Sequence, residues 1–184
     1  MTAASHKILQ LTLLSFLALA IMAPSKSAAQ GESGKPINLS LFDPVQIVSN
    51  DQNVHGFRFS LIYGRNAGFE GLDLSLVGKW DGGGTGVMWS AVGLVEGDFT
   101  GWQSAWLYNG VKGQFTGFQE GAINVTGSMK GFQLGLVNMT DSMNGFQLSF
   151  VNITENLNGL QIGLINVAKN AKGHTILPIV NWKF

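Results

Sequence analysis

The sequence predicts an all-β protein built from one tandem repeat, and three observations lead to this prediction. A pattern of 14 to 16 residues recurs through most of the chain, apolar and polar residues alternate within each copy, and every copy begins with glycine. We expect an antiparallel meander closed into a small β-barrel of about ten strands. The alternative is a β-solenoid, in which each copy forms one coil.

Each copy of the repeat has the pattern of a β-strand. In the copies from Gly56 to Gly159 the second position is apolar, the fifth is small and the seventh is aliphatic. Glycine inside a helix costs roughly 1 kcal/mol, so a unit that always begins with glycine disfavours a helix. The copies begin at Gly56, Gly71, Gly86, Gly101, Gly117, Gly131, Gly145, Gly159 and Gly173.

The third position of the repeat is polar in nearly every copy. Its polar members are Arg58, Asp73, Gln103, Gln119, Gln133, Gln147 and Gln161. In a barrel, these side chains turn inward as a lumen-facing polar column, while the second, fourth and sixth positions meet lipid. In a solenoid, the glutamines and asparagines of successive coils become ladders, and Arg58 lies on Asp73.

The length of the unit favours the barrel. Met129 to Met139 makes a strand of 11 residues and Thr140 to Ser142 a loop of 3, and a transmembrane β-strand needs about 9 to 11 residues. The mean hydropathy is +0.19 and charged residues make up only 12% of the chain, about half the usual share of a soluble protein. Glu120 fits worst, because it falls in a lipid-facing column.

Three segments are expected along the chain. Residues 1–29 have the basic start, apolar run and small residues of a signal peptide cleaved after Ala29. Residues 30–55 form an N-terminal strand and lead-in, and residues 56–184 are the repeats, which form one domain with that lead-in. The final strand, residues 176–184, looks like the terminal strand by which bacterial outer-membrane barrels are recognised for assembly.

Sites of chemistry are not expected. The chain has no cysteine, which excludes disulfides and thiolate sites, and no cluster of lysines and arginines for nucleic acid. His55 and His174 stand alone, and the glycine-rich segment 81–86 is interpreted as a hairpin turn rather than a phosphate or calcium loop. We therefore expect no catalytic residues, no cofactor and no metal, in a protein that is not an enzyme.

The motifs resemble those of the bacterial surface-repeat-containing family of exported proteins. The resemblance is carried by the run 54–66, by Gly71 to Leu76, by the tandem G-F-Q-x-G-x-V-N units and by the closing segment 177–181. The resemblance implies export and a repeat architecture. The family has no assigned activity that could be carried over to this chain.

The function expected from these patterns is non-enzymatic. The chain is expected at the outer membrane or cell surface of a Gram-negative-type bacterium, with the periplasm left open, in a structural or narrow-pore role. Its expected partners are outer-membrane lipid and the barrel-assembly machinery. The sequence identifies no further protein partner. The alternative is a secreted β-solenoid that acts as a surface binding or adhesion module.

Overall fold

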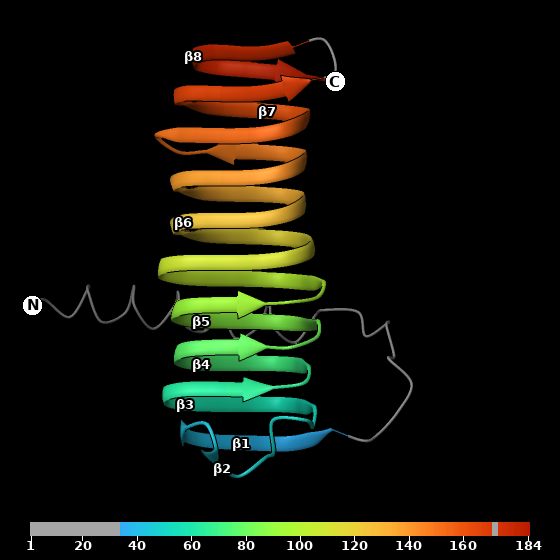
Figure 1. Cartoon of the computed structure of the whole chain (residues 1–184), viewed down its shortest axis with the longest axis vertical. Coiled ribbons are helices and arrows are strands. Elements are labelled where there is room, and N and C mark those ends of the chain that lie inside the picture. The colour runs from blue at the N-terminus through green and yellow to red at the C-terminus, as the bar shows by residue number, and fades with distance from the viewer. Residues whose placement is uncertain (1–33, 171–172) are drawn as a thin grey trace, which may run out of the picture. The chain divides into compact units, whose positions relative to one another are not determined.

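The computed structural model describes residues 34–170 and 173–184, and these residues form stacked β-coils (Figure 1). The expected signal peptide, residues 1–29, lies outside the described residues. The strands are β1 (Lys35–Phe42), β2 (Val45–Gln46), β3 (Val54–Asn66), β4 (Phe69–Trp80), β5 (Gly84–Val95), β6 (Phe99–Leu148), β7 (Val151–Asn170) and β8 (Gly173–Lys183). The longest strand, β6, winds continuously through several coils, and β7 continues through more than one (Figure 1).

Successive copies of the repeat pair in parallel, so the fold is a β-solenoid of about nine turns. Gly56 pairs with Gly71, Gly71 with Gly86, and Gly86 with Gly101, and the same register holds between β6 and β7. A meander would bring neighbouring copies together in opposite directions. The expected barrel is therefore wrong and the β-solenoid alternative is confirmed. The narrow-pore role loses the barrel on which it rested, and the placement at the outer membrane or cell surface stays a prediction.

Antiparallel pairing occurs at the two ends of the stack. At the N-terminal end β2 pairs with β1, and at the C-terminal end β8 folds back against β7. The expected repeat copy at Gly173 is therefore wrong, because Gly173 pairs with Asn170 and the final strand runs back along β7 in place of a further parallel coil. The described residues include no helical segment with the length and apolarity needed to cross a membrane.

The glycine at the first position of each copy is required by the stacking of the coils. These glycines have φ between 131° and 147° from Gly56 to Gly159, a region that residues with a Cβ rarely occupy. A Cβ added at Gly131 would also lie 2.2 Å from the carbonyl oxygen of Gly117 in the preceding coil. The repeat therefore needs glycine for both backbone conformation and close contact between coils.

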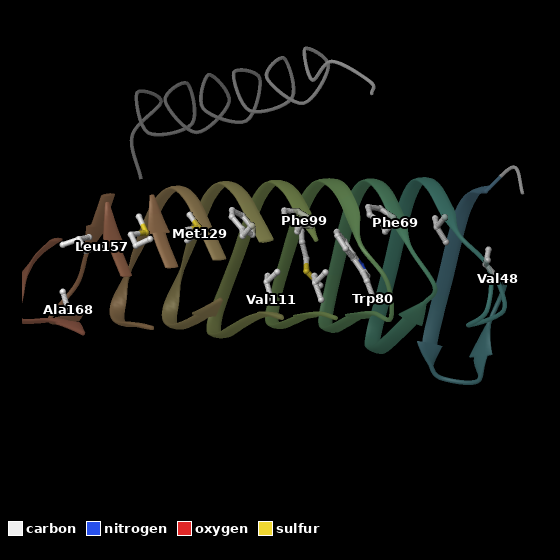
Figure 2. Packing of buried hydrophobic residues seen from close by; sticks show 13 residues of the cluster. Val48, Phe69, Trp80, Phe99, Val111, Met129, Leu157 and Ala168 are labelled. Atoms are coloured by element: carbon white, nitrogen blue, oxygen red, sulfur yellow. The ribbon is translucent and has the colours of Figure 1, made fainter. Parts of the chain in front are cut away.

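The core of the solenoid is narrow and is filled by columns of equivalent residues (Figure 2). One column contains Val54, Phe69, Phe99, Phe115, Met129, Met143 and Leu157, all buried. Gly84 occupies the equivalent place in β5, and a Cβ there would lie 2.9 Å from the ring of Trp80. The Trp80 ring fills that place, with ring centroids 5.0 Å from those of Phe69 and Phe99.

The glycine-rich segment 81–86 links two parallel strands, so the expected hairpin turn is wrong. β4 ends at Trp80 and β5 begins at Gly84, and the two strands run in the same direction. Gly83 sits against the backbone of Asp98, where a Cβ would lie 2.4 Å from the carbonyl oxygen. The glycines thus allow the chain to pass between coils and leave space for Trp80.

Candidate binding surface

The third-position residues lie together in the interior of the solenoid. Arg58, Asp73, Gln103, Gln119, Gln133, Gln147 and Gln161 are all 0% exposed. Gln133 Nε2 donates to Gln119 Oε1 at 2.7 Å, and Gln147 Nε2 donates to Gln133 Oε1 at 2.8 Å. The same donation joins Gln119 to Gln103 at 2.9 Å and Gln161 to Gln147 at 2.8 Å. These side chains therefore bond to one another inside a packed core, in place of the lumen expected for a barrel.

Arg58 and Asp73 form a buried ion pair in adjacent coils, as the solenoid alternative predicted. Arg58 Nε donates to Asp73 Oδ1 at 2.9 Å, and a second bond joins Nη2 to Oδ2. Trp80 Nε1 donates to Asp73 Oδ2 at 3.2 Å, and Arg58 Nη1 to Asn66 Oδ1 at 3.1 Å. The guanidinium also lies 5.5 Å from the ring centroid of Phe69. With its polar groups occupied and no exposure to solvent, this cluster stabilises the fold.

Asparagines form a second ladder on the opposite inward face. Asn109, Asn124, Asn138, Asn152 and Asn166 each lie buried, and successive side chains bond at 2.8 to 3.1 Å. Small residues in the fifth position make room for them. A Cβ at Gly135 would lie 2.7 Å from Asn124 Nδ2. The repeated asparagine in the sequence was the signal for this ladder under the solenoid alternative.

Charged residues on the outside gather where one coil passes to the next. This charged edge consists of Asp81, Glu96, Lys112, Asp141, Glu155 and Lys169, each of which directly follows an inward-facing residue. Arg65 Nε lies 2.7 Å from Asp81 Oδ2, and Lys79 Nζ lies 3.5 Å from both Asp81 and Glu96. The N-terminal part of the edge is therefore a chain of ion pairs across successive coils.

The ion pairs of the charged edge shift the pKa values of their members. A hydrogen bond from Lys112 Nζ, at 2.5 Å, holds the pKa of Glu96 below its ordinary value. The same bond raises the pKa of Lys112, and the bond to Asp81 raises that of Arg65. These groups are exposed to solvent, so each pair is expected to add little to stability.

The sixth and seventh positions of every coil form an uncharged apolar ridge. It consists of Leu61, Ile62, Leu76, Val77, Ala91, Val92, Trp106, Leu107, Ala122, Ile123, Leu136, Val137, Phe150, Val151, Leu164 and Ile165. Trp106 is 76% exposed, Leu164 66% and Phe150 56%. The ridge lies four to five residues before the charged edge in each of the later coils, as from Leu136 and Val137 to Asp141. The two surfaces differ sharply in chemistry.

The strand faces on both sides of the ridge are also largely apolar. One flank holds a row of half-buried aromatic rings, with centroid separations of 6.1 Å for Trp102 and Phe118, 5.4 Å for Phe118 and Phe132, and 4.7 Å for Phe132 and Phe146. The other flank holds Val125, Met139, Ile153 and Val167 in the later coils. Glu120 interrupts the aromatic flank and lies two positions before the ridge.

A shallow hollow of about 300 Å³ lies beside the charged edge. It forms where Gly110 and Gly127 leave out side chains between Leu94, Tyr108 and Val125. Glu96, Lys112 and Asp141 stand at its rim, and the first two are already joined to each other. The hollow thus has a small apolar floor and a rim on which Glu96 and Lys112 are already paired.

His55 lies on the surface, apart from any group of side chains in the described residues that could hold a metal ion. His55 Nδ1 lies 4.0 Å from Glu70 Oε2 on the surface, and both side chains are about half exposed. The side chain of His174 lies outside the described residues. Within residues 34–170 and 173–184, no three His, Cys, Asp or Glu side chains are grouped so that they could hold a metal ion.

The chain matches no family model, no curated protein and no solved structure. The resemblance to the surface-repeat-containing family therefore stays an expectation from the motifs. The barrel interpretation placed the third position inward and the second, fourth and sixth positions outward, and these directions hold in the solenoid. It did not identify the ridge as a distinct surface, because the turn of the coil after the sixth position brings the seventh outward as well.

Proposed function

We propose that this protein is a binding module rather than an enzyme, and that the apolar ridge is its binding surface. The observation that carries the proposal is the row of exposed apolar side chains along the coils, in which no charged residue occurs from Leu61 to Ile165. Export of the module stays an expectation from the pattern of residues 1–29.

The exposed apolar area is costly for a protein that stays alone in water. Monomeric soluble proteins rarely expose a contiguous apolar patch of more than a few hundred Å². Fully burying a leucine or phenylalanine is worth about 1.5 to 3 kcal/mol, and Leu136, Phe150 and Leu164 are each more than half exposed. A surface of this kind in every coil is typical of a site that is covered when the protein works.

The solenoid also makes the ridge rigid and regular. Neighbouring coils are joined by in-register parallel pairing, which sets a spacing of about 4.8 Å between equivalent side chains. The buried glutamine and asparagine ladders fix each coil against the next. A ligand that meets the ridge therefore meets an ordered surface and pays little for ordering it.

The test uses two matched triple variants in the same three coils. The ridge variant is Leu136→Gln/Phe150→Gln/Leu164→Gln, and the edge control is Asp141→Gln/Glu155→Gln/Lys169→Gln. Nile red, an uncharged apolar dye, is expected to fluoresce with the folded wild type and the edge control and to lose most of that signal with the ridge variant. Equal dye signals from both variants, with both folded by circular dichroism, would contradict the proposal.

A further inference from the structure

We infer that the partner of the apolar ridge is the surface of a lipid bilayer, on which the solenoid lies sideways. The inference rests on the proposed function, since it names what the ridge binds. Three features of the described residues favour lipid over a protein partner: the separation of charge from the ridge, the lack of polar groups on the ridge, and the paired backbone along the flank.

The charges are placed as an interfacial protein needs them. Between Phe115 and Asn170, four of the five charged residues lie at the transition between coils: Lys130, Asp141, Glu155 and Lys169. The fifth, Glu120, is the one charged residue on the ridge and its flanks in this range. An element that lies in a membrane interface buries its apolar face about 5 to 10 Å deep and keeps its charged face in water. The later coils of the solenoid have this division.

The ridge offers almost nothing that a protein partner could recognise by hydrogen bonds. Protein interfaces contain about one hydrogen bond per 100 to 200 Å², yet every side chain of the ridge is aliphatic or aromatic, and Trp106 Nε1 is its single polar side-chain atom. Lipid chains have no hydrogen-bond donors or acceptors, so contact with them needs no such bonds. Tryptophan is also the residue that favours the boundary between lipid chains and headgroups.

The backbone permits contact with lipid along the side of the solenoid. Unpaired N–H and C=O groups cost several kcal/mol each in hydrocarbon. In the solenoid each coil pairs with the coils before and after it, so the backbone bonds run along the axis and the flank presents side chains (Figure 1). The side can therefore be dehydrated at low cost, and this favours a sideways orientation.

The later coils are expected to make the deeper contact. Their second flank carries Val125, Met139, Ile153 and Val167. In the earlier coils the equivalent positions hold Arg65 and Lys79, which belong to the ion pairs of the charged edge. The apolar side is thus wider between Gly117 and Asn170 than between Val54 and Val95.

The experiment is flotation of the purified protein with phosphatidylcholine vesicles, which carry no net charge. We expect the wild type to float, and to float equally in 0.1 M and about 1 M salt, because the ridge has no charge for salt to screen. The ridge variant should bind on the order of 100-fold more weakly, because it loses three half-exposed apolar side chains that lipid would bury. The edge control should bind within about twofold of the wild type.

Four outcomes would overturn the inference. The first is wild type that stays with the soluble fraction at the same lipid concentration. The second is flotation that requires anionic lipid and vanishes in high salt, because charge would then carry the binding. The third is an edge control that loses as much binding as the ridge variant. The fourth is ridge-dependent dimers by sedimentation with no flotation, which would make the occupant a second copy of the chain.

The dye experiment separates failure of this inference from failure of the proposed function. If Nile red binding depends on the ridge and vesicle binding does not occur, the ridge is a binding surface and lipid is the wrong partner. If neither dye nor vesicles depend on the ridge, both proposals are wrong. Thermal unfolding of each variant, followed by circular dichroism, shows whether the protein tested is folded.

Discussion

The earlier and later coils share one column of stacked glycines and have different interiors. Between Val54 and Val95 the core holds the Arg58–Asp73 ion pair and the ring of Trp80. Gly64 faces Arg58, Gly78 faces Asp73 and Met88, and Gly93 faces Met88 and Gln103. Between Phe115 and Asn170 it holds parallel ladders of glutamine and asparagine. The register of the stacked glycines is the same in both regions.

The comparison teaches that volume and hydrogen-bond satisfaction, rather than residue type, decide what fills a coil. A Cβ at Gly78 would lie 2.6 Å from Met88 Cε and 3.0 Å from Asp73 Oδ2, so the earlier coils match large third-position groups with glycine across the core. The later coils match glutamine with asparagine. The buried charged and amide side chains of both regions have hydrogen-bond partners, as Arg58 with Asp73 and Gln133 with Gln119 do. The hydroxyls of Ser60, Ser75, Ser90 and Thr140 are buried without one.

The largest expected effect tests what the two regions share. Gly71→Ala and Gly131→Ala should each destabilise the fold by about 4 kcal/mol or more, since the new Cβ would lie 2.0 and 2.2 Å from a carbonyl oxygen of the preceding coil and φ would be strained. Urea unfolding measures the loss. Gly110→Ala is the control, because its nearest atoms belong to the side chains of Tyr108 and Leu94, and it should cost less than about 1 kcal/mol.

Similar losses for Gly71→Ala and Gly131→Ala would show that both regions depend on the same backbone contact. A loss at either position that is no greater than that of Gly110→Ala would contradict the role given to the glycine column.

The second effect tests how the interiors differ. Asp73→Asn strands the buried Arg58 charge, and Gln133→Glu places a carboxylate beside Gln119 Oε1, to which Gln133 now donates. Each should cost about 3 kcal/mol at neutral pH, as unpaired buried charges do. Their pH responses should differ, because a carboxyl can become neutral and a guanidinium cannot.

The direction in which pH changes the stability of Gln133→Glu follows from burial, which raises the pKa of a carboxyl. A group with a raised pKa in the folded state favours folding most below its unfolded pKa, and that stability is lost as pH rises through the folded pKa. Urea unfolding from pH 4 to 8 should therefore show Gln133→Glu weakening relative to wild type with rising pH, while Asp73→Asn shows no such added slope. Parallel pH profiles for the two variants would contradict this explanation.

The smallest effect lies on the surface of the earlier coils. Glu96 has a lowered pKa because of its bond to Lys112, so its contribution is present above its ordinary value of 4.5 and is lost as pH falls through the lower folded value. Glu96→Gln should lower the melting temperature slightly at neutral pH and should match wild type in strong acid. Glu155→Gln, whose carboxylate is 3.5 Å from Lys169, is the matched change in the later coils.

High salt should reduce the effect of Glu96→Gln, since exposed pairs are screened. A melting-temperature difference that persists unchanged in strong acid would show that Glu96 acts by packing and not by charge.

The sequence by itself determined the repeat, its strand character, the inward third position and the outward second, fourth and sixth positions. Alternation with a period of two predicts which side chains share a face of a strand, and Gln133 and Phe132 follow it. The same pattern also predicted that Arg58 would meet Asp73 if the copies stacked as coils, and they do.

Only the tertiary structure decided between barrel and solenoid. Alternation is the same whether the next copy returns antiparallel or continues in parallel. A repeat of 14 residues also fits both a strand of 11 with a loop of 3 and one coil of a solenoid. The choice is made by close contact between coils, as where Gly131 meets the carbonyl oxygen of Gly117, and by ladders such as that of Gln119 and Gln133. The place of Trp80 in the gap at Gly84 and the joining of sixth and seventh positions into one ridge likewise depend on how a coil turns in space, because they bring together residues that local patterns treat separately.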